Sequence, residues 1–234
     1  MVKTLTIAID GPAASGKSTL AKSLADHFSY LYFDTGALYR AVTLAAIEAG
    51  VDVDDEQAVT KLAEDVSIDL LPPSVEDSRL YDVTLNGADC TWGIRTPEVD
   101  ANVSQVSAYP GVRSALKEQQ QRIGQRGGVV MAGRDIGTVV LPQADVKLYL
   151  DASVEERAQR RYQEMAARGS REEYAQVEEG LRQRDQVDAN RAVAPLRPAE
   201  DAIVMKSDGK QAADVLAEAV ELVEQRMAEL EQEA

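Results

Sequence analysis

An eight-residue segment close to the N-terminus constrains this chain more than any other feature. Residues 11–18 read GPAASGKS, which matches the phosphate-binding pattern G-x-x-x-x-G-K-[ST] at every fixed position. The apolar run Thr4–Ile9 precedes it and predicts a buried strand, and apolar residues at helical spacing follow it. Glycines let backbone N–H groups approach phosphate oxygens, and the start of a helix adds positive potential there. Motif and context together predict a nucleoside triphosphate site rather than an ordinary glycine-rich turn.

The side chains of this segment have separate predicted tasks. Lys17 adds a full positive charge at the phosphates, and the Ser18 hydroxyl is placed to ligate the Mg²⁺ that accompanies ATP. The predicted ATP-binding set covers the loop and the start of the helix: Gly11, Pro12, Ala13, Ala14, Ser15, Gly16, Lys17, Ser18 and Thr19.

Composition limits the partners of this site. The 234 residues carry a net charge of −15, which argues against general binding to nucleic acid or to anionic membranes. Residues 157–197 contain nine arginines, no lysine and seven acidic residues, so this stretch is +2 and the rest is −17. Arginine suits flat, bidentate contacts to phosphate, so the stretch indicates a small anionic ligand. A helical face covered by salt bridges is the alternative.

Cysteine content and hydropathy indicate the compartment. The only cysteine, Cys90, excludes an internal disulfide and favours a reducing environment. No stretch is long and apolar enough to span a membrane, and no cleavable apolar segment stands at the N-terminus. We therefore expect a cytoplasmic protein, and nothing in the sequence requires more than a monomer.

Strand and helix patterns alternate along most of the chain and predict an α/β fold with a parallel sheet. Residues 66–93 interrupt this alternation, and Tyr81–Leu85 followed by Asn86-Gly87 predicts a small antiparallel hairpin. Helices are expected at about 97–108, at about 111–123 and over most of 150–200, where Gly169 and Gly180 are candidate hinges. The predicted core strands are Thr4–Ile9, Leu31–Phe33, Val129–Ala132, Val146–Leu150 and Ile203–Met205.

Two classes of phosphate-binding-loop protein compete at this point. A GTP-hydrolysing switch needs Asn-Lys-x-Asp and Asp-x-x-Gly segments, and the sequence contains neither. A small-molecule kinase needs a second anion site that faces the first. Candidate segments are DTGALYR at 34–40 and GRDIGT at 133–138, both placed after core strands, and the late helical segment with Arg184, Asp188, Asn190 and Arg191.

These segments resemble those of the bacterial cytidylate kinases, which phosphorylate CMP and dCMP with ATP. The matching pieces are IDGPAASGKST, DTGALYRA, SQVSAYPGVR, GRDIGTVV and RDQVDANRAVAPL, which run in the family's order from residue 8 to about 196. The resemblance implies one cytidylate-kinase-like domain, 1–234, with a five-stranded core at about 1–34, 124–151 and 195–234. It further implies an inserted monophosphate-binding region at about 35–123, with a small antiparallel sheet, and an arginine-rich helical lid at about 152–194.

The resemblance also implies residue roles. It places Thr35, Arg40, Arg134 and Arg191 on the α-phosphate of the acceptor, and Arg157, Arg160 and Arg161 in a lid over ATP. It makes Ser104, Arg113 and Asp135 the residues that recognise cytosine. A carboxylate can accept a hydrogen bond from the N4 amino group of cytosine, whereas the O4 of uracil has no hydrogen to donate. Arg184 and Asp188 are the pair at the sugar, although a helical Arg-x-x-x-Asp is often only a surface ion pair. The residues expected to act in catalysis are Lys17, Arg134, Arg157 and Arg191.

One position departs from the family pattern. The residue before Gly133 is often acidic in this family, and here it is Ala132. If that carboxylate helps to order Mg²⁺, this chain must use Asp34, Asp135 or phosphate oxygens in its place. Two alternatives to cytidylate phosphorylation stay open: a kinase for UMP, AMP or a non-nucleotide acceptor, and a module that senses nucleotides without turnover.

Overall fold

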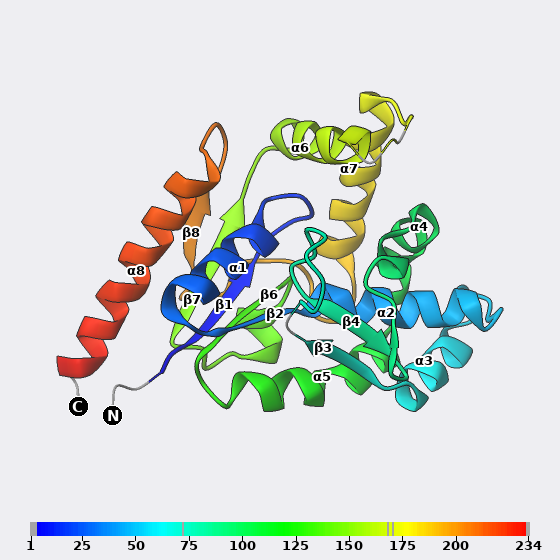
Figure 1. Ribbon diagram of the computed structural model, residues 1–234, viewed down its shortest axis with the longest axis horizontal. Coiled ribbons are helices and arrows are strands. Elements are labelled where there is room, and N and C mark those ends of the chain that lie inside the picture. Colours follow the sequence, from blue (N-terminus) through cyan, green and yellow to red (C-terminus); the bar gives the residue numbers. More distant parts are fainter. Residues whose placement is uncertain (1–3, 72, 168, 170, 233–234) are drawn as a thin grey trace. The chain divides into compact units, whose positions relative to one another are not determined.

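Five strands in the order β2–β6–β1–β7–β8 form the main sheet of the computed structural model (Figure 1). The structure describes residues 4–71, 73–167, 169 and 171–232, so the ends of the predicted domain, 1–3 and 233–234, lie outside the described residues. β1 pairs in parallel with both β6 and β7, and β7 pairs in parallel with β8. The predicted parallel core is therefore confirmed. Its strands are β1 (Thr6–Asp10), β2 (Leu31–Asp34), β6 (Val129–Gly133), β7 (Val146–Asp151) and β8 (Ile203–Lys206).

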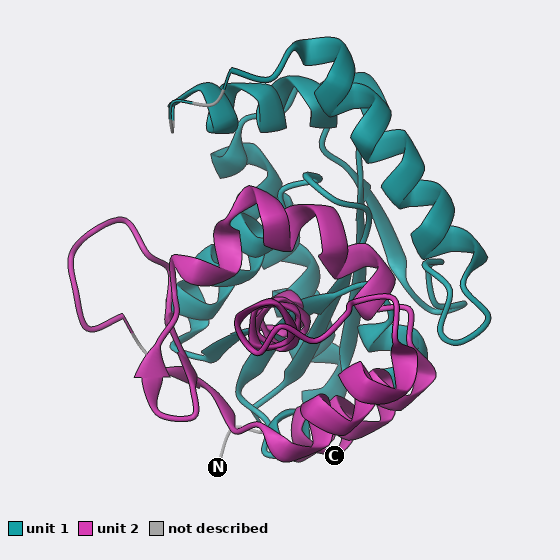
Figure 2. Ribbon diagram, turned by 90° about the vertical axis from the view of Figure 1, so that its right-hand side faces the viewer, with its two compact units in different colours: residues 1–33, 123–234 teal, residues 34–122 magenta. Residues whose placement is uncertain are grey.

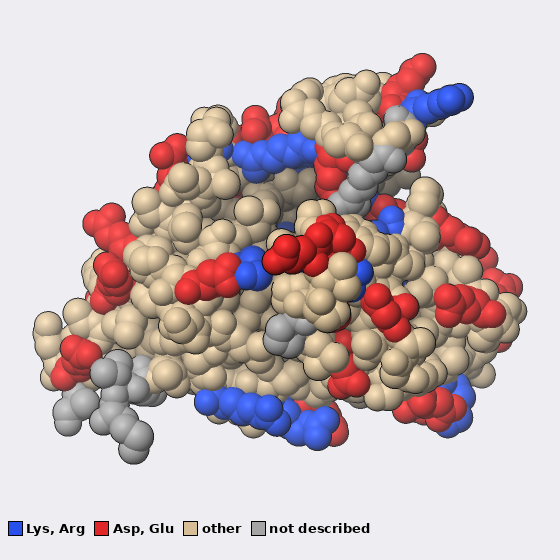
Figure 3. Space-filling model, in the orientation of Figure 1, with Lys and Arg blue, Asp and Glu red and all other residues tan. Residues whose placement is uncertain are grey.

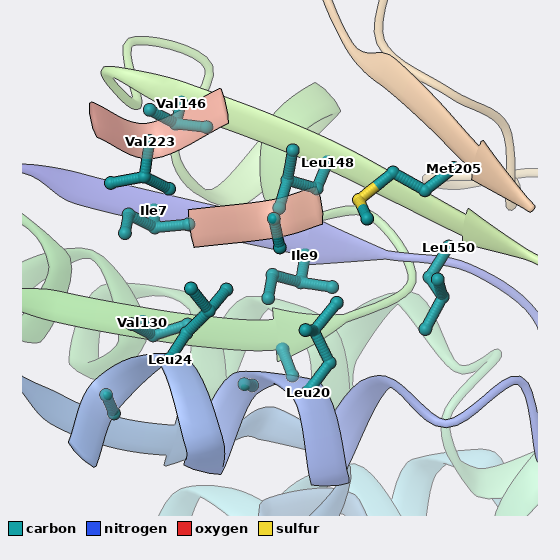
Figure 4. Packing of buried hydrophobic residues seen from close by; sticks show 14 of the residues in the cluster. Ile7, Ile9, Leu20, Leu24, Val130, Val146, Leu148, Leu150, Met205 and Val223 are labelled. Atoms are coloured by element: carbon teal, nitrogen blue, oxygen red, sulfur yellow. The ribbon is translucent and has the colours of Figure 1, made fainter. Parts of the chain in front are cut away.

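Helices α1 (Lys17–Phe28) and α8 (Ala212–Gln232) cover the sheet with one shared apolar cluster. Leu20 and Leu24, one turn apart on α1, point at the strands in Figure 4, and Val223 of α8 lies in the same cluster. Ile7 and Ile9 of β1 are fully buried, as expected for the middle strand of a parallel sheet. This packing fixes the carboxyl end of β1, from which the phosphate-binding loop leaves the sheet.

The chain divides into two compact units, which are coloured separately in Figure 2. Unit 1 holds residues 1–33 and 123–234, and unit 2 holds residues 34–122. In unit 1, helices α6 (Val154–Ala167) and α7 (Tyr174–Asn190) lie against each other and meet the phosphate-binding loop through Ala13, Ala158 and Leu181. A π-helical turn, η2 (Ile136–Val140), follows β6.

Unit 2 contains a three-stranded antiparallel sheet in the order β3–β4–β5. The predicted hairpin is confirmed, because Asn86 and Gly87 join β4 to β5 with φ angles of 51° and 82°, the left-handed conformations of a tight hairpin turn. Three elements lack a counterpart in the sequence prediction: helix α3, strand β3 and the short 3-10 helix η1. The elements of unit 2 are α2 (Thr35–Glu48), α3 (Glu56–Asp65), β3 (Ile68–Leu71), β4 (Asp82–Leu85), β5 (Ala88–Asp89), η1 (Gly93–Arg95), α4 (Pro97–Val106) and α5 (Pro110–Gly124, whose last two residues belong to unit 1).

The structure shows no break at Gly180, one of the two candidate hinges. Gly180 lies in the middle of α7, whose helix runs unbroken from Tyr174 to Asn190 because Val177 and Leu181 on either side of it are buried. Gly169 is different: it lies between α6 and α7 with a φ of +83°, a conformation that glycine adopts without strain. The chain therefore turns at Gly169 and stays helical at Gly180.

Charged side chains on the surface follow the acidic composition. Figure 3 shows acidic side chains spread over the face in view, with basic ones in smaller groups among them. None of the helices in the described part of the chain has the length and apolar character needed to cross a membrane.

Candidate active site

The phosphate-binding loop leaves β1 in a conformation that requires glycine at two positions. Gly11 has a φ of +149°, and a Cβ on it would lie 2.1 Å from the carbonyl oxygen of Leu150. Gly16 has a φ of 95° and is the N-cap of α1. Glycine at these positions allows the backbone conformation from which N–H groups of the loop and of the first turn of α1 can bind an anion.

Lys17 is held against the loop itself. Its Nζ lies 2.6 Å from the carbonyl oxygen of Pro12 and 3.4 Å from Ser15 Oγ, and the side chain is buried. The ammonium group is thus tied to the loop that precedes it. Ser18 follows Lys17 as the second residue of α1, so its side chain lies at the same end of the helix.

Two of the predicted lid arginines contact the loop directly. Arg157 donates to the carbonyl oxygen of Ala13 at 3.2 Å, and Arg160 donates to that of Ser15 at 3.3 Å. Arg157 is also paired with both carboxylate oxygens of Asp185 on α7, at 3.1 and 2.6 Å. The structure therefore brings α6, α7 and the loop together around a buried guanidinium group. The third arginine, Arg161, pairs with Glu164 on its own helix.

Ser207 supports the loop from the end of β8. Its Oγ lies 3.2 Å from the carbonyl oxygen of Ser15, and its N–H donates to the carbonyl oxygen of Asp151 at 2.9 Å. Arg160 donates to both the hydroxyl and the carbonyl oxygen of Ser207, at 3.0 and 2.6 Å. Sequence analysis did not find Ser207, because its contacts link residues that are far apart along the chain.

Asp10, the last residue of β1, is a second residue that sequence analysis missed. Its carboxylate accepts one N–H from Ile136 and one from Gly137, each at 2.8 Å. Burial raises the pKa of Asp10 to about 6; the two backbone hydrogen bonds and Lys17 act in the opposite direction, and Asp135 acts with burial. Asp10 thus ties the end of β1 to the turn that carries Arg134 and Asp135. Its position directly before the first glycine of the motif was the available sequence signal.

Four of the predicted acceptor-binding residues form one buried ionic cluster in unit 1. Arg134 donates to Asp188 at 2.8 Å, and Arg191 lies 3.8 Å from both Asp135 and Asp188. Burial raises the pKa of Asp188, but the charges of Arg134, Arg184 and Arg191 outweigh it and leave that pKa below its ordinary value. Asp188 is therefore an anion held among three cations, and Arg184, one helical turn away, belongs to the same group.

Unit 2 places its predicted phosphate-binding residues at the start of α2. Thr35 is the first residue of that helix and is buried, and Asp34 caps it by accepting the N–H of Gly36 at 2.9 Å. Arg40 lies on the same helix and donates to the carbonyl oxygen of Ile94 at 2.9 Å and to Asp100 at 2.6 Å. Thr35 and Arg40 thus project from two consecutive turns of one helix.

Two further side chains fix the cap of α2. The Tyr81 hydroxyl donates to Asp34 at 3.1 Å and accepts from Arg95 at 2.9 Å. Burial raises the pKa of Tyr81 far above its ordinary value, so this hydroxyl stays protonated. Sequence analysis missed Tyr81, Arg95 and Asp100, since their significance comes only from contacts across unit 2.

Ser104 and Arg113 are linked at the end of α4 through a third residue, Ser107. Ser107 joins them, because its hydroxyl donates to the carbonyl oxygen of Ser104 at 3.0 Å and its own carbonyl accepts from Arg113 at 3.1 Å. The guanidinium carbon of Arg113 also lies 5.4 Å from the ring centre of Tyr39 on α2, a cation–π distance. Arg113 is thereby held in a defined orientation between α2, α4 and α5.

The side chains near the loop offer few ligands for a metal ion. Among the residues that the structure describes, no group of three or more His, Cys, Asp or Glu side chains could hold one. Both oxygens of Asp10 already accept backbone N–H groups, and Ala132 is buried in β6. The Ser18 hydroxyl fits Mg²⁺ best, because Mg²⁺ in nucleotide sites takes one or two protein oxygens and fills its other positions with phosphate oxygens and water.

Comparison with known proteins adds independent information. The model of the family described as cytidylate kinase matches residues 7–225. A cytidylate kinase from Herpetosiphon aurantiacus is 55% identical over 210 residues, which cover 90% of each chain. Another from Chloroflexus aggregans is 51% identical, covering 91% of this chain and 90% of that one. A third, from Anoxybacillus flavithermus, is 48% identical and covers 97% of this chain and 99% of the relative.

Proposed function

The chain belongs to the cytidylate kinase family, and on that premise we propose how its residues transfer the γ-phosphoryl group of ATP to CMP and dCMP. The products are ADP and CDP or dCDP. The observation that carries this proposal is a phosphate-binding loop at the start of α1 that Lys17 and two arginines of α6, Arg157 and Arg160, all contact. A kinase of this kind needs that concentration of positive charge where the triphosphate binds.

The donor side follows from unit 1. The backbone N–H groups of residues 11–16 and the start of α1 bind the phosphates, and Lys17 neutralises charge on the β- and γ-phosphates. Arg157 and Arg160 keep the loop in shape through Ala13 and Ser15 and add positive potential beside it. Arg161 is proposed to reach ATP from the outer face of α6. Bound with ATP, Mg²⁺ would be held by Ser18 and would supply charge neutralisation at the transferring group.

The acceptor side follows from the residue roles that the family implies. Thr35, Arg40, Arg134 and Arg191 bind the α-phosphate of CMP, which offers paired oxygens to guanidinium forks. Asp188, held as an anion by three arginines, accepts from a ribose hydroxyl, with Arg184 beside it. A phosphate acceptor is largely ionised near neutral pH, so the chain needs no general base. Positioning and charge neutralisation supply the rate acceleration.

Specificity for cytosine depends on Ser104, Arg113 and Asp135. A carboxylate accepts a hydrogen bond from the N4 amino group of cytosine but faces a lone pair on O4 of uracil. A site built around such a hydrogen bond can discriminate by up to about 10⁴. Asp135 is buried beside Arg191, so an unsatisfied partner there would be costly.

The proposal is tested by offering CMP, dCMP, UMP, AMP and water as acceptors in a coupled assay of ADP release. Rates with CMP and dCMP should exceed the rate with water by several orders of magnitude, and UMP should be a poor acceptor. A CMP rate equal to the water rate would leave a nucleotide-sensing module, and a UMP rate equal to the CMP rate would remove the base-reading role.

Replacing Asp135 tests that role by itself. Asp135→Asn removes the negative charge and replaces one of the two acceptor oxygens by an NH2 donor, so the hydrogen bond from the N4 amino group is weakened and kcat/KM for CMP should fall about 100-fold or more. The KM for ATP should stay within about two-fold of the wild type, since the loop is unchanged. If ATP binding weakened as much as CMP use, Asp135 would serve metal binding or folding instead.

A further inference from the structure

A carboxylate that no role above assigns lies against one of the proposed phosphate-binding arginines. Arg40 donates through Nη1 to the main-chain oxygen of Ile94 and through Nη2 to Asp100 Oδ1, at 2.9 and 2.6 Å. Asp100 stands in the first turn of α4, where the helix terminus stabilises a negative charge. The Arg40 charge is therefore already compensated within unit 2.

The pair is accessible enough to open. The side chains of Arg40 and Asp100 keep 15% and 25% of their surface exposed, whereas the pair of Arg157 and Asp185 is closed on the arginine side, with 4% exposed. Separating Arg40 from Asp100 leaves the carboxylate at the surface, where water can solvate it. The bond to the carbonyl oxygen of Ile94 does not depend on Asp100, so Arg40 keeps its orientation when the carboxylate lets go.

We propose that Asp100 is a positioning residue that sets the affinity for the acceptor phosphate by competing with it for Arg40. This inference rests on the proposed role of Arg40 at the α-phosphate. A nucleoside monophosphate brings nearly two negative charges to a guanidinium group that Asp100 already neutralises, and the carboxylate repels those charges. Asp100 thereby keeps the KM for the acceptor higher than the arginine set alone would give, which favours release of the charged product.

The direction of the effect separates this role from a purely orienting one. Asp100→Asn keeps the size of the side chain and an oxygen that can accept from Arg40, and removes only the charge. If Asp100 served to orient Arg40, the amide would preserve the KM for CMP. If Asp100 competes with the phosphate, the KM for CMP should fall, about three- to ten-fold for one like charge at this range.

The experiment compares Asp100→Asn with Glu98→Gln in steady-state kinetics and in calorimetric titrations with CMP and with cytidine. Glu98 is exposed in the same turn of α4, so its variant removes the same charge from the helix. We expect a lower KM and Kd for CMP in Asp100→Asn alone, an effect that shrinks at high salt. The KM for ATP and the Kd for cytidine, which carries no phosphate, should not change.

Several results would overturn the inference: an unchanged or higher KM for CMP in Asp100→Asn, an equal fall in Glu98→Gln, or an equal gain for cytidine. If the asparagine variant does not fold, Asp100→Ser removes the same charge and should lower the KM in the same way. A wild-type protein that does not phosphorylate CMP would instead refute the proposed function. When the wild type does phosphorylate CMP, the KM values for CMP of Asp100→Asn and Glu98→Gln decide whether the inference holds.

Discussion

At the residue scale, three of the arginines proposed to contact phosphate groups have carboxylate partners within their own unit. Arg134 pairs with Asp188, Arg157 with Asp185 and Arg40 with Asp100. Pairing of this kind avoids the cost of a bare buried charge. It also means that a bound phosphate replaces or joins an existing anion at each guanidinium group. The affinity for phosphate thus depends on the free-energy difference between the arginine paired with its carboxylate and the arginine bound to phosphate.

Asp10 gives a prediction about pH and stability. Its pKa of about 6 in the folded protein exceeds the ordinary aspartate value of 3.8, so the folded state binds the proton more tightly than the unfolded state. The stability that this proton contributes is complete below pH 3.8 and is lost as pH rises toward 6. At 1.36 kcal/mol per pH unit, the loss is about 3 kcal/mol.

Chemical denaturation of the wild type and of Asp10→Asn measures this contribution. The free energy of unfolding of the wild type relative to the variant should decrease between about pH 4 and pH 6 and stay level above it. A relative stability that does not change with pH would mean that Asp10 has an ordinary pKa in the folded protein.

The residue scale also shows what sequence could and could not reveal about the site. Lys17 and Ser18 were predicted because the phosphate-binding motif is local and its spacing is fixed. Asp10, Asp185 and Ser207 were not predicted, because each contacts a residue far away in the sequence. Ile136, Arg157 and Ser15, which they contact, are separated from them by 126, 28 and 192 residues. Contacts of this range depend on the register of the sheet and on the packing of α6 and α7, which no local pattern records.

At the scale of elements, the buried strands were the most predictable part of the chain. β6 reads as a continuous apolar run, and β1 nearly so, because both faces of a parallel sheet are covered. Helix α3 was missed although Asp55 caps it by accepting the N–H of Ala58 at 3.0 Å. Only Val59 and Ala63 of α3 are buried, so its apolar stripe is too thin to stand out. Strand β3 alternates in burial over only four residues, and so short a segment does not distinguish a strand from a loop by its sequence pattern.

Two glycine substitutions test the assignment of rigid and turning positions. Gly11→Ala would push a Cβ to 2.1 Å from the Leu150 carbonyl oxygen, so the loop must shift and ATP affinity should fall about 100-fold or more.

Gly180→Ala meets nothing within 4 Å inside α7, so it should stabilise the protein by about 1 kcal/mol through helix propensity. Because Gly180 is no hinge, kcat should not change in that variant.

Thermal unfolding and steady-state assays of both variants give the answer. A Gly180→Ala protein with a clearly lower kcat would restore a hinge in α7. A Gly11→Ala protein with wild-type ATP affinity would show that the contact with β7 does not shape the loop.

At the scale of the whole molecule, substrate binding should appear as stabilisation. A ligand at 100 times its Kd adds about 2.7 kcal/mol to the free energy of unfolding when it binds only the folded state. An ATP analogue and CMP should each raise the Tm of the wild type. Lys17→Met should lose most of the shift with the ATP analogue and keep the shift with CMP.

Lys22→Met is the matched control, because Lys22 lies on the same helix and pairs with Asp26 at the surface. It should respond to both ligands as the wild type does. Equal loss of both shifts in Lys17→Met would mean that the loop lysine supports folding and has no selective role at the donor.

Trp92 is the only tryptophan of the chain, and it lies in unit 2 with its indole N–H on Asp77 at 2.8 Å. It precedes η1, whose Ile94 carbonyl oxygen holds Arg40. Intrinsic emission excited at the red edge of protein absorption therefore reports on unit 2 alone, with a fluorophore two residues from the guanidinium anchor. The protein thus carries a built-in optical probe, which can follow rearrangement around η1 in stopped-flow traces without any attached dye.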